Sequence, residues 1–309
     1  MTFFLFCLAG LVGLLFGGTL LVQGAVSITA RLGVSPLLIG VVLVGFGTST
    51  PELLTSLNAA LAGAPGIATG NVVGSNIANI LLILGLTALV RPALLDRQMM
   101  VLDGGAMVLV TLTAVPMLLS GIVGRIDGAI LCAALTVYLI VRLRTGGEVD
   151  DVVDLEAPSP LQRALVIFAA GLAVTLISAH LLVLGAVGFA RQLDISEAMI
   201  GVTIVAIGTS LPELVTSLIA ARKGQSDLAI GNILGSNIFN ISGILGLTAL
   251  IHPLEVPASI YGYDQWIMVA ATLALMIAGL VWGRLSRLTG GVFLLAYGGG
   301  YIATLVRSL

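Results

Sequence analysis

Residues 45–57 read G-F-G-T-S-T-P-E-L-L-T-S-L, and residues 206–218 read A-I-G-T-S-L-P-E-L-V-T-S-L. The similarity continues on both sides, so that segments 40–90 and 201–251 align without gaps at a constant offset of 161. Of the 51 aligned positions, 31 are identical. Apolar sequence matches itself easily by chance, but Thr, Ser, Pro, Glu, Gly and Asn do not recur in the same order by chance. The chain therefore carries an internal repeat.

The composition around these motifs is that of a membrane protein. Of the 309 residues, 58% are hydrophobic and only 9% are charged, and the mean hydropathy is +1.16. A soluble domain carries about 25% charged residues, which excludes a soluble enzyme here. A net charge of −2 excludes a nucleic-acid binder, which needs clustered positive charge. The apolar runs are continuous rather than alternating, so we expect helices in a lipid bilayer and no β-barrel.

About 20 apolar residues are needed to cross a bilayer as a helix, and ten segments satisfy this length. Five precede and five follow the acidic stretch 144–160, which we interpret as a solvated linker. The predicted spans are 3–30, 35–62, 66–90, 98–120, 125–143, 161–190, 196–221, 227–251, 262–283 and 288–307. An odd number of spans per half turns the second half upside down, as in many secondary transporters. We therefore predict an all-α polytopic membrane protein of two inverted five-helix repeats, 1–143 and 161–309.

The basic residues predict an orientation for these spans. If the connections alternate between two faces, one face receives ten of the 13 basic residues and the other receives three. Positively charged residues are in excess on the cytoplasmic side of membrane proteins. The linker 144–160 is therefore predicted to be cytoplasmic, with both termini outside.

Glu52 and Glu213 are the acidic residues that lie deep within the predicted spans, at equivalent positions of the repeat. A charge at the bilayer centre costs about 2.5–3.5 kcal/mol on insertion scales, which favours a functional role. Each follows a proline that cannot donate a hydrogen bond to the carbonyl four residues earlier, at Gly47 or Gly208. We therefore expect a kinked helix in each motif, with carbonyl oxygens that a bound cation could satisfy.

Polar side chains at helical spacing surround these glutamates. They are Thr48 and Ser49 before Glu52, the pair Ser75 and Asn79, and the equivalent pair Ser236 and Asn240. All of them present oxygen, and no His or Cys accompanies them, which favours Ca²⁺ or Na⁺ over zinc, copper or iron. Asn76 and Asn237 could be ligands or interhelical hydrogen-bonding groups, and both alternatives stay open here. Asp103 and Asp264 stand near the starts of spans and are predicted N-caps.

At the motifs G-T-S-x-P-E and G-S-N-I-x-N the chain resembles the cation/calcium exchanger superfamily, and most closely its bacterial inner-membrane calcium/sodium antiporter branch. The resemblance implies the sodium/calcium exchanger fold and no cofactor. An intramembrane enzyme is a weaker alternative, because no aspartate pair, Ser–His or H-E-x-x-H constellation lies within the predicted spans. The resemblance also implies that Glu52 and Glu213 bind Ca²⁺ or Na⁺ alternately, with the carbonyls of Gly45 and Ala206 at flanking Na⁺ sites. Roles follow for Thr48, Ser49, Ser75, Asn79, Thr209, Ser210, Ser236 and Asn240.

Such a protein would exchange Ca²⁺ for Na⁺ by alternating access across a bacterial or archaeal plasma membrane, and a monomeric state is compatible with it. One departure concerns Asn240, where sodium/calcium exchangers of the superfamily often carry Asp. Two formal negative charges balance one Ca²⁺, two Na⁺ or two protons, so H⁺ is an alternative counter-ion. A cation channel and a transporter of Mn²⁺ or Mg²⁺ are the rival functions that the same oxygen ligands allow.

Overall fold

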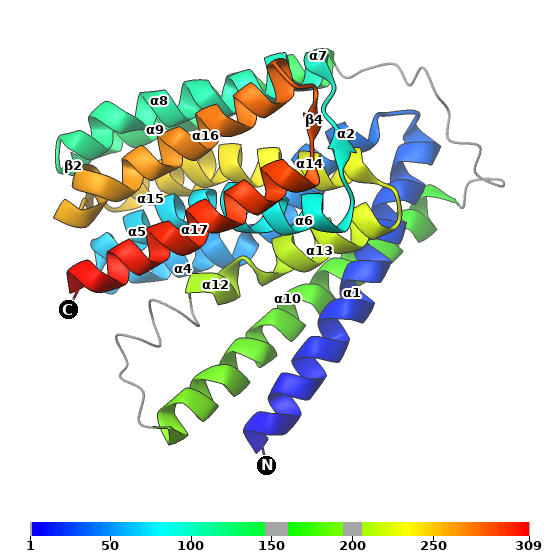
Figure 1. Cartoon of the computed structure of the whole chain (residues 1–309), viewed down its shortest axis with the longest axis horizontal. Coiled ribbons are helices and arrows are strands. Elements are labelled where there is room, and N and C mark those ends of the chain that lie inside the picture. The colour runs from blue at the N-terminus through cyan, green and yellow to red at the C-terminus, as the bar shows by residue number, and fades with distance from the viewer. Residues whose placement is uncertain (1, 146–159, 194–205, 309) are drawn as a thin grey trace. The chain divides into compact units, whose positions relative to one another are not determined.

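The computed structural model describes residues 2–145, 160–193 and 206–308, so most of the predicted linker and the start of the predicted span 196–221 lie outside the described residues. This part of the chain is almost entirely helical (Figure 1). Seven of its helices are long and apolar enough to cross a membrane, and one bent pair makes an eighth. The prediction of a polytopic helical membrane protein is confirmed, whereas the count of ten spans stays a prediction.

The elements of the first half end at residue 144, and labels with η denote π-helical segments. They are α1 (Thr2–Leu32), α2 (Pro36–Ile39), η1 (Gly40–Gly45), α3 (Phe46–Thr48), α4 (Thr50–Leu61), α5 (Pro65–Ile77), η2 (Ala78–Leu84), α6 (Gly85–Val90), β1 (Ala93–Leu94), α7 (Arg97–Met99), η3 (Met100–Gly104), α8 (Gly105–Leu119), β2 (Ile122–Val123) and α9 (Arg125–Arg144).

The second half repeats this order. Its described elements are α10 (Leu161–Gln192), α12 (Ala206–Thr209), α13 (Leu211–Arg222), α14 (Ser226–Ile238), η5 (Phe239–Leu245), α15 (Gly246–Ile251), β3 (Leu254–Glu255), η6 (Ile260–Asp264), α16 (Gln265–Leu280), β4 (Arg284–Leu285) and α17 (Arg287–Ser308). From α4 to β1 and from α13 to β3, the described bounds of matching elements differ by the 161 residues of the sequence offset. The repeat in the sequence is thus also a repeat of local structure, including its π-helical segments.

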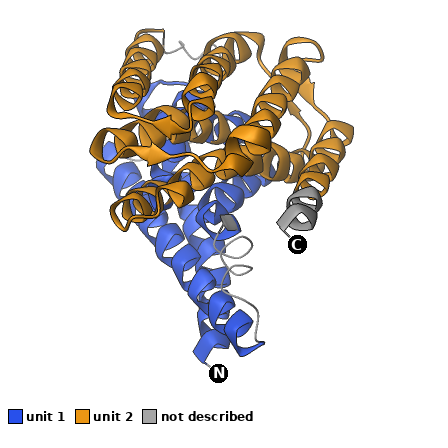
Figure 2. Cartoon of the chain, turned by 90° about the vertical axis from the view of Figure 1, so that its left-hand side faces the viewer, with its two compact units in different colours: residues 1–51, 146–232 blue, residues 52–145, 233–309 orange. Residues whose placement is uncertain are grey.

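The chain forms two compact units, coloured separately in Figure 2. Unit 1 comprises Met1–Pro51 and Gly146–Asn232, and unit 2 comprises Glu52–Thr145 and Ile233–Leu309. Each unit therefore combines segments from both halves of the sequence. The predicted division at the linker describes the repeat in the sequence, and these units do not follow it.

Unit 1 is built on two long helices, α1 and α10, which lie side by side in Figure 1. Glycines allow this close approach, because a Cβ atom at Gly17 would lie 2.7 Å from the main-chain nitrogen of Thr175. Leu21, Ala25 and Ile28 of α1 are buried in the core of this unit. The outer face of α1 exposes large apolar side chains such as Phe16, as expected for a helix in contact with lipid.

Within unit 2, several pairs of contacts are equivalent: an element of the first half contacts an element of the second half, and the matching elements make the same contact in reverse. Strand β1 pairs with β4, and β2 pairs with β3, both antiparallel. Helix α6 packs on α17, and α15 packs on α9. A Cβ atom at Gly290 would lie 2.6 Å from the carbonyl oxygen of Gly85, and one at Gly128 would lie 2.6 Å from that of Gly246. Equivalent elements of the two halves thus make matching contacts within unit 2.

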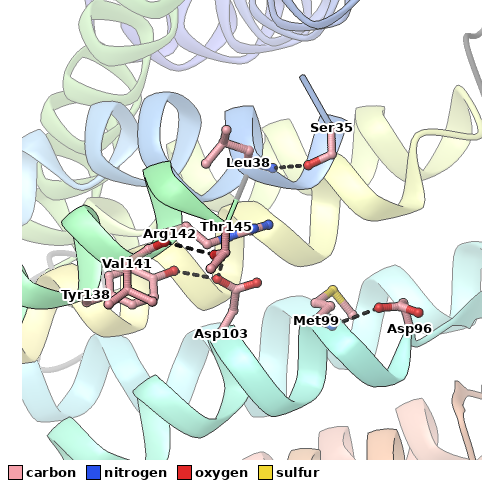
Figure 3. Close-up of polar contacts among 9 residues, drawn as sticks. All are labelled: Ser35, Leu38, Asp96, Met99, Asp103, Tyr138, Val141, Arg142 and Thr145. Carbon is pink, nitrogen blue, oxygen red and sulfur yellow. Dashed lines mark hydrogen bonds and ion pairs between the residues drawn. The ribbon is translucent and has the colours of Figure 1, made fainter. Parts of the chain in front are cut away.

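The prediction that Asp103 is an N-cap is wrong. The helix begins earlier, at Arg97, and its N-cap is Asp96, which accepts a hydrogen bond from the Met99 main-chain nitrogen at 2.8 Å. Asp103 is instead fully buried in η3, where it accepts from the Tyr138 hydroxyl at 2.7 Å and forms an ion pair with Arg142 at 2.9 Å (Figure 3). Asp264 lies at the N-cap position of α16, as predicted, but its side chain forms no capping hydrogen bond there.

Candidate functional site

The helix of the first motif is interrupted at the predicted place. Helix α3 ends at Thr48 and α4 begins at Thr50, and the helical segment Pro36–Thr48 is bent by 40° relative to α4. The kink expected beside Pro51 is therefore confirmed. The carbonyl oxygen of Gly47, which Pro51 leaves without its main-chain donor, accepts the Thr50 hydroxyl at 2.8 Å.

The second motif is interrupted in the same way, since α12 ends at Thr209 and α13 begins at Leu211. Ala206 is the first residue of α12, and Ser210, at the break, is buried. Leu211 occupies the position of Thr50, so the hydroxyl that covers the first motif's carbonyl has no equivalent there. The two copies therefore differ in the groups that surround their prolines.

In unit 1 the structure joins the two copies of the motif. The hydroxyl of Ser49, from the first copy, donates to Oε1 of Glu213, from the second copy, at 2.8 Å, and both side chains are buried. The Gly45 carbonyl accepts the main-chain N–H of Ser49 at 3.1 Å. The Thr48 hydroxyl lies 3.2 Å from Oδ1 of Asn232 and donates to it. Hydrogen bonds thus link residues of both copies, and Ser49 of the first copy contacts the carboxylate of Glu213 in the second.

Asn232 is a residue of this site that the sequence reasoning missed. Its amide nitrogen donates to the main-chain carbonyl of Glu213 at 3.4 Å and to the Ser217 hydroxyl at 2.9 Å. In unit 2 its counterpart Asn71 donates to the carbonyl of Glu52 at 3.1 Å and to the Ser56 hydroxyl at 3.0 Å. The signal was present in the sequence, because Gly-Asn begins the second conserved stretch of both copies at the same offset.

In unit 2, Glu52 is buried together with the predicted residues Ser75, Asn79, Ser236 and Asn240. None of the hydrogen-bonding atoms of the Asn240 side chain has a hydrogen-bond partner within the described segments of the chain. A buried amide without partners costs free energy unless water or an ion satisfies it. Asn240 therefore offers an oxygen ligand inside the protein.

Asn79 is held in a defined orientation. Its amide nitrogen donates to Oδ1 of Asn237 at 3.0 Å, and Asn237 in turn donates to the sulfur of Met107 at 3.6 Å. The oxygen of Asn79 is left buried and without a hydrogen-bond partner among the described residues. Asn237 therefore forms an interhelical hydrogen bond, the second of its two predicted alternatives, and its role as a ligand stays a prediction. Asn76 donates to the Val72 carbonyl at 3.1 Å within its own helix.

The donor set in both units is one of hard oxygen atoms. Each unit holds one of the two glutamates with buried hydroxyl and amide groups, and no group of three or more His, Cys, Asp or Glu side chains suited to a metal occurs in the segments described. Carboxylate, amide and carbonyl oxygens suit Ca²⁺ and Na⁺, whereas zinc and copper prefer nitrogen and sulfur. The buried glutamates in both motifs thus fit a hard cation as substrate.

Comparison with known proteins gives full-length relatives. CaxA of Alkalimonas amylolytica is 40% identical over 304 residues, which cover 95% of each chain. The sodium/calcium exchanger MaX1 of Methanosarcina acetivorans is 34% identical over 335 residues, which cover 95% of this chain and 96% of that protein. A solved structure of the sodium-calcium exchanger NCX_Mj, soaked with 10 mM Na⁺ and zero Ca²⁺, is 34% identical. It matches with a TM-score of 0.87 and covers 99% of this chain and 98% of that chain.

The sequence also matches the family described as sodium/calcium exchanger protein over residues 2–144 and 163–306, which include both copies of the motif. The resemblance to the cation/calcium exchanger superfamily is thereby confirmed. With two breaks at T-S-x-P-E, a buried glutamate after each and relatives along its full length, this chain belongs to the sodium/calcium exchanger protein family.

Proposed function

We propose that the protein is a secondary active antiporter that exchanges Ca²⁺ for Na⁺, or for H⁺, by alternating access. The observation that carries this proposal is a fully buried glutamate in each copy of the motif, next to a break in its helix. An ionised carboxylate in a protein interior needs a compensating charge. A cation supplies that charge, and the named exchangers MaX1 and NCX_Mj support Na⁺ and Ca²⁺ as the ions.

The ligands that we propose are oxygen atoms of both copies of the motif. Glu52 and Glu213 provide the charge, and the remaining ligands are neutral hydroxyl, amide and carbonyl groups. They are Thr48, Ser49, Ser75 and Asn79 in the first copy, Thr209, Ser210, Ser236 and Asn240 in the second, and the carbonyls of Gly45 and Ala206. The hydrogen bond from Ser49 to Glu213 supports a site to which both copies contribute.

Coupling follows from the charge of this site. Two carboxylates are neutralised by one Ca²⁺ or by two monovalent cations, and an uncompensated charge is costly in a low-dielectric interior. Only the neutralised site passes easily between its two orientations, so one ion species must leave before the other binds. Because Asn240 contributes no formal charge, proton-coupled exchange is the alternative to Na⁺ coupling.

We further propose ten membrane spans arranged as two inverted repeats, 1–143 and 161–309. The contacts exchanged between halves within unit 2 support a two-fold relation of the repeats. An odd number of spans in the first half makes the second half inverted. The bias of basic residues supports a cytoplasmic linker 144–160 and external termini in a prokaryotic plasma membrane, where a monomer could function alone.

Transport of radioactive calcium into proteoliposomes tests the proposal, with Na⁺, K⁺ and H⁺ gradients imposed one at a time. An antiporter takes up Ca²⁺ only when an exchangeable cation is present on the opposite side. Uptake that requires internal Na⁺ supports Na⁺ coupling, and uptake that requires only a pH gradient supports H⁺ coupling. Downhill Ca²⁺ flux without any counter-ion would instead identify a channel and contradict the proposal.

A further inference from the structure

The side chain of Asn232 joins the two copies of the motif within unit 1. It is fully buried, and its amide nitrogen donates to the Glu213 carbonyl and to the Ser217 hydroxyl. Its amide oxygen accepts from the Thr48 hydroxyl at 3.2 Å. Thr48 belongs to the first copy and Glu213 to the second. One amide thus connects two of the proposed ligand residues.

The orientation of this amide follows from the chemistry of its neighbours. A carbonyl oxygen cannot donate, so the group that faces the Glu213 carbonyl must be the amide NH₂. The amide oxygen then faces Thr48, and because this oxygen only accepts, the Thr48 hydroxyl must supply the proton. The other acceptor near that hydroxyl, the Gly45 carbonyl, is farther away at 3.4 Å. The proton of Thr48 is therefore directed at Asn232, which leaves the lone pairs of the hydroxyl oxygen as acceptors.

The same residues form a closed ring. Ser49, which follows Thr48 in the chain, donates to the Glu213 carboxylate at 2.8 Å. The path runs from this carboxylate through Ser49, Thr48 and Asn232 back to the main chain of Glu213. Linked hydrogen bonds hold their members more firmly than separate ones, since moving one member strains the others. The ring therefore fixes the helix break of the first copy against the carboxylate of the second.

The part of this arrangement that holds the glutamate helix occurs twice. In unit 2, Asn71 donates to the Glu52 carbonyl and to the Ser56 hydroxyl, which are the counterparts of the Asn232 contacts at an offset of 161. In each unit, an Asn amide thus donates to the main-chain carbonyl of the glutamate and to the hydroxyl of the Ser four residues later. The contact therefore belongs to the repeated motif and is not confined to one unit.

We propose that Asn232 is a positioning residue of the cation site, which acts by holding Thr48 and Glu213 in one hydrogen-bonded frame. This inference rests on the proposed function, because it assumes that both neighbours bind the transported cation. It assigns to the second conserved stretch of the motif a role that its Gly-Asn dipeptide alone does not reveal. A residue that merely stabilised helix packing would affect thermal stability without affecting cation affinity.

A double-mutant cycle on the full chain in detergent tests this role. Asn232→Ala, Thr48→Val and the double variant are compared by calorimetric titration with Ca²⁺ and by their thermal midpoints without Ca²⁺. We expect each single change to weaken Ca²⁺ binding roughly tenfold, as for the loss of one buried hydrogen bond, and the double change to weaken it by clearly less than the product of the two single effects. Thr48→Ser keeps the donor and should bind Ca²⁺ nearly as the unaltered protein does.

Asn71→Ala combined with Thr48→Val is the matched control. Asn71 makes the equivalent hydrogen bonds in unit 2, to the Glu52 carbonyl and the Ser56 hydroxyl, and does not contact Thr48. The losses of Ca²⁺ affinity caused by Asn71→Ala and Thr48→Val should therefore multiply in the double variant. Two outcomes would overturn the role of Asn232 even if the unaltered protein binds Ca²⁺. In the first, the loss of Ca²⁺ affinity in the double variant Asn232→Ala/Thr48→Val equals the product of the two single losses. In the second, Asn232→Ala lowers the thermal midpoint but leaves Ca²⁺ affinity unchanged. Absence of Ca²⁺ binding by the unaltered protein would instead overturn the proposed function, and this inference with it.

Discussion

At the scale of residues, the two glutamates and the amides around them carry the proposed chemistry. The Glu213 carboxylate accepts a hydrogen bond from Ser49, and its main-chain carbonyl accepts one from the amide of Asn232. In the same way, the main-chain carbonyl of Glu52 accepts a hydrogen bond from Asn71. The sequence could predict the glutamates, because a carboxylate among apolar residues is conspicuous when it recurs. It could not predict the hydrogen bonds of Asn71 and Asn232 to the glutamates. An Asn in a helix can hydrogen-bond within its own turn or to another helix, and only the tertiary packing decides which.

Glu52→Gln and Glu213→Gln should each reduce calcium exchange in proteoliposomes to the level of liposomes without protein. The substitution keeps the shape of the side chain but removes one of the two charges that balance Ca²⁺. Expression and membrane insertion should persist, since the buried charge is removed and not added. Full exchange by either variant would be incompatible with a two-carboxylate site.

Met107→Leu should weaken cation binding more than Met268→Leu. Both methionines are buried and occupy equivalent positions at an offset of 161, so Met268→Leu makes the same side-chain change at the matching position. Only Met107 accepts a hydrogen bond from Asn237 in the described structure, and Asn237 orients Asn79. We expect about a threefold change in Ca²⁺ affinity by titration, since sulfur is a weak acceptor. Equal effects of the two variants would show that the sulfur does not orient Asn79.

At the scale of elements, close helix packing stabilises both units, and the buried ion pair between Asp103 and Arg142 stabilises unit 2. Hydrophobic patterning predicted the long helices well, because continuous apolar runs have few alternatives in a membrane. The partner of Asp103 was not predictable in this way. Asp103 and Arg142 are 39 positions apart, and capping was the simpler expectation for an acidic residue near a helix start.

Gly24→Ala should disturb the packing of α1 on α10. A Cβ atom at Gly24 would lie 2.5 Å from the main-chain nitrogen of Phe168, and main chain cannot move aside as a side chain can. Overpacking of this kind costs about 1–3 kcal/mol, which should lower the thermal midpoint in detergent. Gly105→Ala in α8 is the control, because nothing lies within 4 Å of its added Cβ. An unchanged midpoint for Gly24→Ala would argue against this close packing.

Arg142→Met should destabilise unit 2 because it leaves the buried carboxylate of Asp103 without its ion-pair partner. Removing one member of a buried pair costs about 3–5 kcal/mol, so the thermal midpoint should fall clearly. Arg144→Met removes the same charge from an exposed position two residues later and should change the midpoint little. Adding Asp103→Asn to Arg142→Met should recover part of the loss, and no recovery would contradict the assignment.

At the scale of the whole molecule, the repeat in the sequence is the organising feature. It predicted two equivalent breaks, and the described structure has both. It did not predict that each compact unit would combine segments of both halves, because an offset in sequence says nothing about which surfaces pack. The contacts exchanged between halves in unit 2 arise from tertiary packing, which leaves little trace in a single sequence.

The central claim is that Ca²⁺ and the counter-ion compete for the same pair of carboxylates. Calorimetric titration of the solubilised protein with Ca²⁺ at increasing Na⁺ concentration, and separately at decreasing pH, tests it most directly. We predict that the competing ion raises the apparent Kd for Ca²⁺ without changing the number of Ca²⁺ bound, and that Glu213→Gln loses measurable Ca²⁺ binding under the same conditions. Ca²⁺ binding that is indifferent to both Na⁺ and pH, or that survives unchanged in Glu213→Gln, would contradict the account.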